Sequence, residues 1–486
     1  MRLAIPVRHE RVDFYRDSSQ AAMHQNPLYH TSGGGLSAGS SSGGGLSGGS
    51  VFTAGAPIEA FDLERHTLAN GLRVVLHRDT TLPLVAINLW YHVGSKNEGP
   101  GRTGFAHLFE HLLFQGSENV GTNDHFRWIQ QAGGVANGST WYDRTNYYEV
   151  LPTHYLDLGL WLESDRMGRF LPAITQEKLD NQREVVINER KQKMDNQPYG
   201  RAFERLHELL YDEGHPYRWP VIGYVDDLTA ATLDDVRSFF RSYYVPRNAV
   251  LTLAGDIDYD HALSRIEHYF NDIPAGQPVV RPAAPPAALA SERREIQPDD
   301  VQLPRIYMAF NGPAYGQHEW YAADLLSMGL SGGKSSPMFE DLIYHRRLAQ
   351  DVGCYIFPTE LTATFAVIAT AKPGVAPEQL EAAINEHFVR AASEPLSEVD
   401  FERSRNQLLA DHYGQLQALD RRADLLSLFT TYFDDPIGAI REVDRLRAVT
   451  REDVMAFAAE RLGPQQRAVV TVVPRETEVA TREGAS

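Results

Sequence analysis

Hydrophobic residues fall into strand-like and helix-like runs from about residue 61 onward. Short runs of β-branched and aliphatic residues, bounded by turn residues, predict strands. In the first half these runs span residues 72–77, 85–93, 147–151 and 249–253. The longer segments predicted to be helices span residues 104–116, 123–132 and 175–194. Both kinds of element occur throughout the chain, which predicts an α+β fold.

The end of each half carries the same residue pattern. The spacing of Val, Asp, Leu, Thr and Phe from Val225 to Phe239 recurs from Val443 to Phe457, 218 positions later and without a gap. Each copy leads through a proline into a predicted strand, at 249–253 in the first and 468–472 in the second. The repeat predicts two homologous domains of roughly 220 residues, each built from a sheet and helices.

Segments of unusual composition set the predicted domain boundaries. Residues 1–55, rich in Gly and Ser, are expected to form a disordered, flexible tail. The N-terminal domain is predicted at 56–273, and a Pro/Ala-rich linker at 274–298 follows it. The C-terminal domain is predicted at 299–476, with a short tail at 477–486.

Composition narrows the classes of function. The chain of 486 residues is 43% hydrophobic and 23% charged, as is usual for a soluble globular protein. Its formal net charge of −18 argues against a nucleic-acid partner, which would require basic patches. The single cysteine, Cys354, excludes an intrachain disulfide and a zinc site built from thiolates.

The hydrophobic pattern also allows a prediction of the cellular compartment. No run of 18 consecutive apolar residues occurs, so no membrane-spanning helix and no membrane association are predicted. Charged residues interrupt the apolar start at Met1–Val7 at once, so no signal peptide is recognised. We therefore expect a cytoplasmic protein. A periplasmic location stays open in case the start of the chain is wrongly assigned.

The predicted helix at 104–116 carries two histidines and a glutamate on one face. At about 100° per residue, His107, Glu110 and His111 lie within roughly one quadrant. The rest of the helix is mostly apolar, so we expect it to be buried, where unpartnered polar groups cost several kcal/mol. Two imidazoles suit Zn²⁺, and a carboxylate that is not a ligand can take a proton from bound water. The alternative is a pair of core histidines beside an ion-paired glutamate.

A zinc site of this kind requires a third protein ligand, normally a carboxylate. The predicted helix at 175–194 offers two candidates, Glu184 and Glu189, with the apolar residues Val185–Ile187 between them. The residues alone leave the choice between the two open.

Several motifs in a fixed order resemble one known family. They are His107-x-x-Glu110-His111, Gly133-Gly134-x-x-Asn137, Asp143–Tyr148, the Glu-Val-Val-x-x-Glu-Arg run ending at Arg190, and Asn196-x-Pro198-Tyr199-Gly200. This order resembles the pitrilysin (insulinase) family of zinc peptidases, in which H-x-x-E-H is the inverted form of H-E-x-x-H. The pattern is most similar to the bacterial homologues of the mitochondrial processing peptidase β subunit, and it covers residues 60 to 475.

The resemblance implies specific roles. His107, His111 and Glu189 would bind one Zn²⁺ per chain, and Glu110 would act as the general base. Each domain is expected to be a mostly antiparallel sheet covered by helices, and the two together to form half of a peptidase chamber. The chain would hydrolyse peptides or unstructured polypeptide segments.

The resemblance also implies a substrate-binding strand at 135–140. An extended peptide would pair with this edge strand, with Asn137, Gly138 and Ser139 beside it. The alternative is a hairpin in which Asn137-Gly138 forms the turn.

Three positions depart from the family pattern. Gln182 stands where the family usually has an acid, seven residues before the ligand glutamate. Glu184 is therefore predicted to replace that acid in supporting the metal ligands. Ile343 and Gln350 stand where single-chain members carry the Arg and Tyr that stabilise the oxyanion. We therefore expect a homologous partner subunit, in a heterodimer or a homodimer, to supply that pair. The alternative function is a non-catalytic scaffold subunit of a larger assembly.

The second half offers an internal comparison for the metal motif. Leu112-Leu113-x-x-Gly116 aligns with Leu325-Leu326-x-x-Gly329. In this register His107, Glu110 and His111 correspond to Trp320, Ala323 and Asp324. The helix recurs without the ligands, which favours a chemical role for them. The glycine-rich loop at 329–336 fails the P-loop pattern, because Met328 stands at its first glycine.

Overall fold

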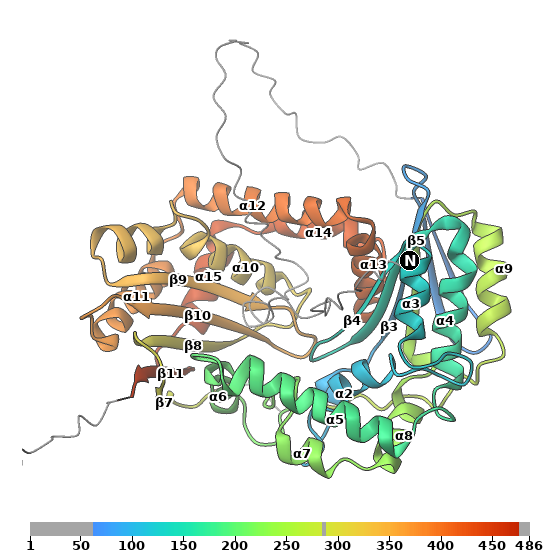
Figure 1. Cartoon of the computed structure of the whole chain (residues 1–486). Coiled ribbons are helices and arrows are strands. Elements are labelled where there is room, and N and C mark those ends of the chain that lie inside the picture. Colours follow the sequence, from blue (N-terminus) through green and yellow to red (C-terminus); the bar gives the residue numbers. More distant parts are fainter. Residues whose placement is uncertain (1–61, 284–287, 476–486) are drawn as a thin grey trace, which may run out of the picture.

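A computed structural model describes residues 62–283 and 288–475, which form two sheets with helices packed on both (Figure 1). The predicted tails at 1–55 and 477–486 lie outside the described residues. Within the described part of the chain, no helix is both long and apolar enough to cross a bilayer.

The first sheet has six strands in the order β1-β2-β6-β3-β5-β4. Only β2 and β6 run parallel, and every other neighbouring pair is antiparallel. The strands are β1 (Leu63–Thr67), β2 (Arg73–Arg78), β3 (Leu84–Tyr91), β4 (Val135–Thr140), β5 (Thr145–Pro152) and β6 (Ala249–Gly255). The four strands predicted in this half are therefore present, and β4 lies at an edge.

The second sheet has five strands in the order β7-β11-β8-β10-β9. Its only parallel pair is β7 with β11, so it repeats the order β2-β6-β3-β5-β4 of the first sheet. The strands are β7 (Arg293–Asp299), β8 (Arg305–Gly312), β9 (Ala349–Phe357), β10 (Ala363–Ala371) and β11 (Arg467–Pro474). The predicted fold class, two related α+β halves with mostly antiparallel sheets, is confirmed. Strand β7 begins inside the segment predicted as linker at 274–298, so that segment is not all connecting chain.

Helices connect and cover the strands in both halves. Those of the first half are α2 (Phe105–Leu112), α3 (Asp124–Gln131), α4 (Leu156–Arg169), α5 (Gln176–Arg190), α6 (Ala202–Leu210), α7 (Val225–Ala230), α8 (Leu233–Tyr243) and α9 (Tyr259–Phe270). Those of the second half are α10 (His318–Ser331), α11 (Pro377–Ser393), α12 (Glu398–Gln417), α13 (Leu419–Phe433), α14 (Gly438–Ala448) and α15 (Arg451–Arg461).

The repeat found in the sequence begins in α7 and at the end of α14, and it continues into α8 and α15, whose ends are 218 positions apart. Each of α8 and α15 begins with a reciprocal capping box. The threonine hydroxyl accepts a hydrogen bond from the backbone N–H of an aspartate three residues later, and the aspartate carboxylate accepts one from the backbone N–H of the threonine. The pairs are Thr232 with Asp235 and Thr450 with Asp453. The same local sequence thus starts the same helix twice.

Each half places one helix against the sheet of the other half. Helix α6 of the first half packs on β8 and β11 of the second sheet, where Leu206 and Leu210 join a cluster with Val470. Helix α13 of the second half packs on β3 and β6 of the first sheet, where Leu425 joins a cluster with Trp90. Each sheet is therefore covered on one face by the other half, which holds the halves in a fixed relation.

Candidate metal centre

Helix α2 is held at its start by a carboxylate and along its length by apolar packing. Glu98 accepts hydrogen bonds from the backbone N–H groups of Gly104, at 2.8 Å, and Ala106, at 2.7 Å. These are first-turn donors without a partner inside the helix. Burial raises the pKa of Glu98 well above its usual range, although the two backbone hydrogen bonds oppose this. Leu108 and Phe109 are fully buried on the side that faces the core. The other side of α2 carries the two histidines.

Helix α5 brings a carboxylate to those histidines. Glu189 Oε2 lies 3.2 Å from His111 Nε2 and 3.8 Å from His107 Nε2. The three side chains are 10–13% exposed, and one ligand atom from each lies within 4.8 Å of the others. Ligand atoms of tetrahedral zinc are about 3.3 Å apart, given bonds of about 2.0–2.1 Å. The spacing therefore fits a metal ion between His107, His111 and Glu189.

The charges of the three groups also fit a metal ion. Burial by itself would raise the pKa of Glu189. The hydrogen bond with His111 and the positive charges of His107, His111 and Lys193 have the larger effect, and they hold that pKa well below its usual range. Burial lowers the pKa of His107, although Glu189 opposes this. Burial would also lower the pKa of His111, but Glu189 and Glu110 raise it. An ionised carboxylate and a neutral imidazole are the forms that bind metal, and a metal ion would displace a proton from His111.

Glu110 lies on the same helix, against the edge strand β4. A Cβ placed on Gly138 of β4 would lie 3.3 Å from Glu110 Cγ and 3.1 Å from a ring carbon of Phe114. Only glycine lets the strand approach the helix this closely without a shift of those neighbours. The carboxylate of Glu110 is thus brought next to the strand on which a peptide was predicted to pair.

Asn137, Gly138 and Ser139 lie within strand β4, so the predicted alternative of an Asn137-Gly138 hairpin turn is wrong. Asn137 is paired with Tyr148 and Ser139 with Asn146 of β5. Asn137 Oδ1 accepts from the Gly138 N–H at 2.9 Å. Ser139 Oγ donates to Asn146 Oδ1 at 2.6 Å. Contact of these residues with a substrate stays a prediction.

The structure does not bring Glu184, the predicted supporting acid, to the histidines. Its side chain is exposed, whereas Glu189 and Gln182 face inward. Five residues of α-helix place Glu184 about 140° from Glu189, while seven residues return Gln182 close to the same direction. The assignment of Glu184 is therefore corrected.

The group that does support Glu189 is Lys193, which the sequence reading missed. Its Nζ lies 2.5 Å from Glu189 Oε1. The signal in the sequence was the four-residue spacing between the two, which places side chains on one helix face.

Ile343 and Gln350 lie in the second half, where the family resemblance implied an Arg and a Tyr. Ile343 is half-buried in a π-helical segment at Phe339–His345, and its carbonyl accepts from Lys372 Nζ at 3.0 Å. Gln350 is exposed near the start of β9. Neither side chain carries a cation or a phenol.

A second cluster of titratable groups lies in the core of the first half and was also missed. His125, Glu149 and Glu163 are each at most 4% exposed, and Arg166 lies among them. Arg166 donates to Glu163 and lies 3.4 Å from His125 Nε2. Burial, and then the charge of Glu163, raise the pKa of Glu149 well above its usual range. Arg166 forms an ion pair with Glu163, and the raised pKa of Glu149 favours its neutral form. The charges of this cluster can therefore be balanced without a metal ion.

Two family models match the chain, one in each half. The model described as "Insulinase (Peptidase family M16)" matches residues 73–218, and "Peptidase M16 inactive domain" matches residues 230–408. The chain belongs to the insulinase (M16) family of peptidases. The first match contains the whole His107, His111, Glu110 and Glu189 set, and the second contains the helix without it.

Named relatives of this M16 chain are zinc proteases. Zinc protease PqqE of Helicobacter pylori is 28% identical over 391 residues, which are 78% of this chain and 86% of that protein. An uncharacterized zinc protease, SCO5738 of Streptomyces coelicolor, is 26% identical over 406 residues, covering 82% of this chain and 87% of that protein.

Solved structures agree with the fold. A protease from Helicobacter pylori superposes with a TM-score of 0.79 at 26% identity, covering 85% of this chain and all of that one. A peptidase M16 inactive domain from Pseudomonas fluorescens gives a TM-score of 0.75 at 17% identity, covering 86% of this chain and 98% of that one. The second match concerns the fold alone.

Proposed function

We propose that this chain is a zinc-dependent metalloendopeptidase subunit that hydrolyses peptides or unstructured polypeptide segments. The observation that carries the proposal is the meeting of Glu189 with His107 and His111, with Glu110 on the same helix and against an edge strand. Relatives named as zinc proteases support the same metal and the same class of reaction.

Each residue would have a distinct task. His107, His111 and Glu189 would hold the zinc ion, which when bound polarises a carbonyl and lowers the pKa of water. Glu110 would take the proton of the attacking water and pass it to the leaving amine. The backbone of β4 would pair with the peptide as an added strand, which gives affinity that tolerates many sequences. The glycine at position 138 would let the bound strand lie close to Glu110.

A homologous partner subunit would complete the site. Oxyanion donors are each worth about two to three orders of magnitude in rate, and Ile343 and Gln350 cannot act as such donors. A partner with an Arg and a Tyr at these positions would supply them across a shared chamber. We therefore expect low activity from the chain by itself.

A second candidate function is a non-catalytic scaffold subunit. The residues Ile343 and Gln350 favour it, because a chain without its oxyanion donors has lost part of the catalytic machinery. The set of His107, Glu110, His111 and Glu189 favours catalysis, because a scaffold has no need of Glu110.

The test is peptidase activity on a library of unstructured peptides, with zinc content measured on the same samples. The chain is assayed alone and with any homologue that co-purifies with it, as wild type, Glu110→Gln and Glu118→Gln. Glu118 is an exposed carboxylate outside the site and serves as the matched control. We expect activity with the partner, its loss in Glu110→Gln and its retention in Glu118→Gln. Zinc binding without activity in any combination would favour the scaffold.

A further inference from the structure

We propose that Lys193 is a positioning residue, which holds Glu189 as a one-oxygen metal ligand and places a compensating positive charge behind it. The inference rests on the proposed zinc site and concerns how this chain tunes it. Lys193 acts through Glu189 and is not assigned any contact with substrate.

The two oxygens of Glu189 face different groups. Oε2 faces the imidazoles of His111 and His107, at 3.2 and 3.8 Å. Oε1 accepts a charge-assisted hydrogen bond from Lys193 Nζ, which lies 2.5 Å away. With Oε1 bound in this way, only Oε2 faces the two imidazoles and would be free to bind the ion. A one-oxygen carboxylate leaves room for the water that a catalytic zinc ion keeps as its fourth ligand.

The backbone that carries Lys193 is fixed by its surroundings. Helix α5 ends at Arg190 and continues as a π-helical turn at Lys191–Asp195, a geometry that is frequent at functional sites. Arg190 is 3% exposed and donates to Glu204 Oε2 at 2.6 Å and to the Gly223 carbonyl at 2.9 Å. These contacts anchor the end of α5, so the position of Lys193 relative to Glu189 does not depend on the ion pair itself.

The ion pair has little to offer the stability of the fold. The Lys193 side chain is 26% exposed, and partly exposed pairs at this spacing typically contribute less than about 1 kcal/mol. Its effect is expected instead at the metal. Mutation of a group that orients a metal ligand typically costs about 10- to 100-fold in metal affinity or activity, so an effect of this size, of either sign, is measurable.

The sign of the effect follows from charge. With Lys193 present, Glu189 and the ammonium together are neutral, so the ligand set leaves the full charge of the metal ion uncompensated. Removing the ammonium removes a repulsion and frees Oε1 to join Oε2 on the metal. Lys193→Met should therefore bind metal more tightly, with a higher coordination number.

The experiment compares the full chain as wild type, Lys193→Met, Lys193→Arg and Lys191→Met. Lys191 is an exposed lysine of the same turn, so Lys191→Met removes the same charge without touching Glu189. Each protein is loaded with Co²⁺ for its visible absorption spectrum and with Zn²⁺ for competition against a chelator. We expect Lys193→Met to lose intensity in the cobalt d–d bands and to bind zinc on the order of tenfold more tightly. Lys193→Arg and Lys191→Met should match the wild type.

Each outcome is decisive. Unchanged spectra and affinity in Lys193→Met, with one metal ion per chain, would overturn the role of Lys193 and leave the proposed peptidase intact. Weaker binding with an unchanged spectrum would overturn it as well, since the lysine would then only support the helix end. A wild-type chain that binds no metal would overturn the zinc site and this inference together.

Discussion

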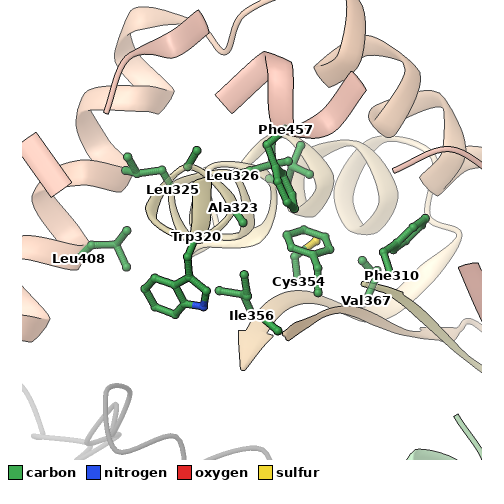
Figure 2. Packing of buried hydrophobic residues seen from close by; sticks show 14 of the residues in the cluster. Phe310, Trp320, Ala323, Leu325, Leu326, Cys354, Ile356, Val367, Leu408 and Phe457 are labelled. Atoms are coloured by element: carbon green, nitrogen blue, oxygen red, sulfur yellow. The ribbon is translucent and has the colours of Figure 1, made fainter. Parts of the chain in front are cut away.

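Helices α2 and α10 occupy corresponding places in the two halves, and their first residues are 213 positions apart. In α2 the positions on one face are His107, Glu110 and His111, and they meet Glu189 of α5. In α10 the corresponding positions are Trp320, Ala323 and Asp324, which are at most 4% exposed. Figure 2 shows Trp320 and Ala323 beside Ile356 and Phe457, in an apolar core. The fold thus does not require the histidines, and among the described residues the candidate metal site lies in the first half alone.

A second pair of positions teaches the same lesson. Glu149 of β5 and Ala369 of β10 correspond through the 218-position repeat. Glu149 pairs with Ile87, which pairs with Leu253 of β6, and Ala369 pairs with Ile306, which pairs with Thr471 of β11. Ala369 belongs to an apolar cluster, whereas Glu149 belongs to the buried cluster with His125, Glu163 and Arg166. Equivalent buried strand positions can thus hold either an apolar or a titratable side chain, provided that the surrounding side chains are of the same kind.

The largest expected effect is a difference in zinc content between two variants, one in α2 and one at the corresponding position of α10. His111→Asn should reduce bound zinc from one ion per chain to almost none, because the site loses one of three ligands. Asp324→Asn, at the corresponding position of α10, should leave the zinc content unchanged. Metal analysis after dialysis measures this, with circular dichroism to verify folding. Zinc retained in His111→Asn would place the metal elsewhere.

Acid should destabilise the first half before the second. Burial lowers the pKa of His92, His207 and His215 to about 4, and Glu360 only partly opposes this at His92. Because these histidines have a pKa near 6.5 when unfolded, their contribution is full above about pH 6.5 and is lost as the pH falls toward 4. The free energy of unfolding from urea titrations should decline over this window by several kcal/mol.

Hydrogen exchange measured at each pH shows which half of the protein loses stability. Peptides from the first half should exchange sooner than those from the second, and His207→Phe should flatten the decline. A decline of equal size in both halves, or none in this window, would contradict the assignment.

The buried cluster should respond unequally to two similar changes. Glu163→Gln removes the partner of buried Arg166 and should cost about 3–5 kcal/mol. Glu149→Gln replaces a protonated carboxyl with a neutral amide of similar shape and should cost less than about 1 kcal/mol. Denaturant unfolding at pH 7 measures both. Equal costs would mean that Glu149 is ionised in the folded protein.

The smallest effect should be the same in both halves. Thr232→Ala and Thr450→Ala each remove the capping hydroxyl at the start of a repeated helix and should each cost about 1 kcal/mol. Valine at either position is the matched variant of similar size without the hydroxyl. Two clearly different values would show that the repeated helices do not contribute equally to cooperative unfolding.

Local spacing let the sequence predict a large part of this molecule. Residues three and four apart share a helix face whatever the rest of the chain does, so His107, Glu110 and His111 could be grouped from their positions alone. Strand runs and the capping residues of α8 and α15 are equally local, so four of the six strands of the first half, and the repeat, were predicted from the residues; β1 was not predicted.

Contacts between distant segments were decided only by the tertiary structure. The rotation of α5 about its axis turns Glu189 inward and Glu184 outward, and it depends on what α5 packs against. Asp424 of α13 accepts hydrogen bonds from Trp90 Nε1 at 2.8 Å and Asn146 Nδ2 at 3.1 Å, across more than half of the chain. The residue pattern of one helix or strand does not show which other element packs against it. For this reason the sequence determined which residues share the candidate metal-binding face of α2, and the packing of α5 and β4 against α2 determined which carboxylate and which strand meet it.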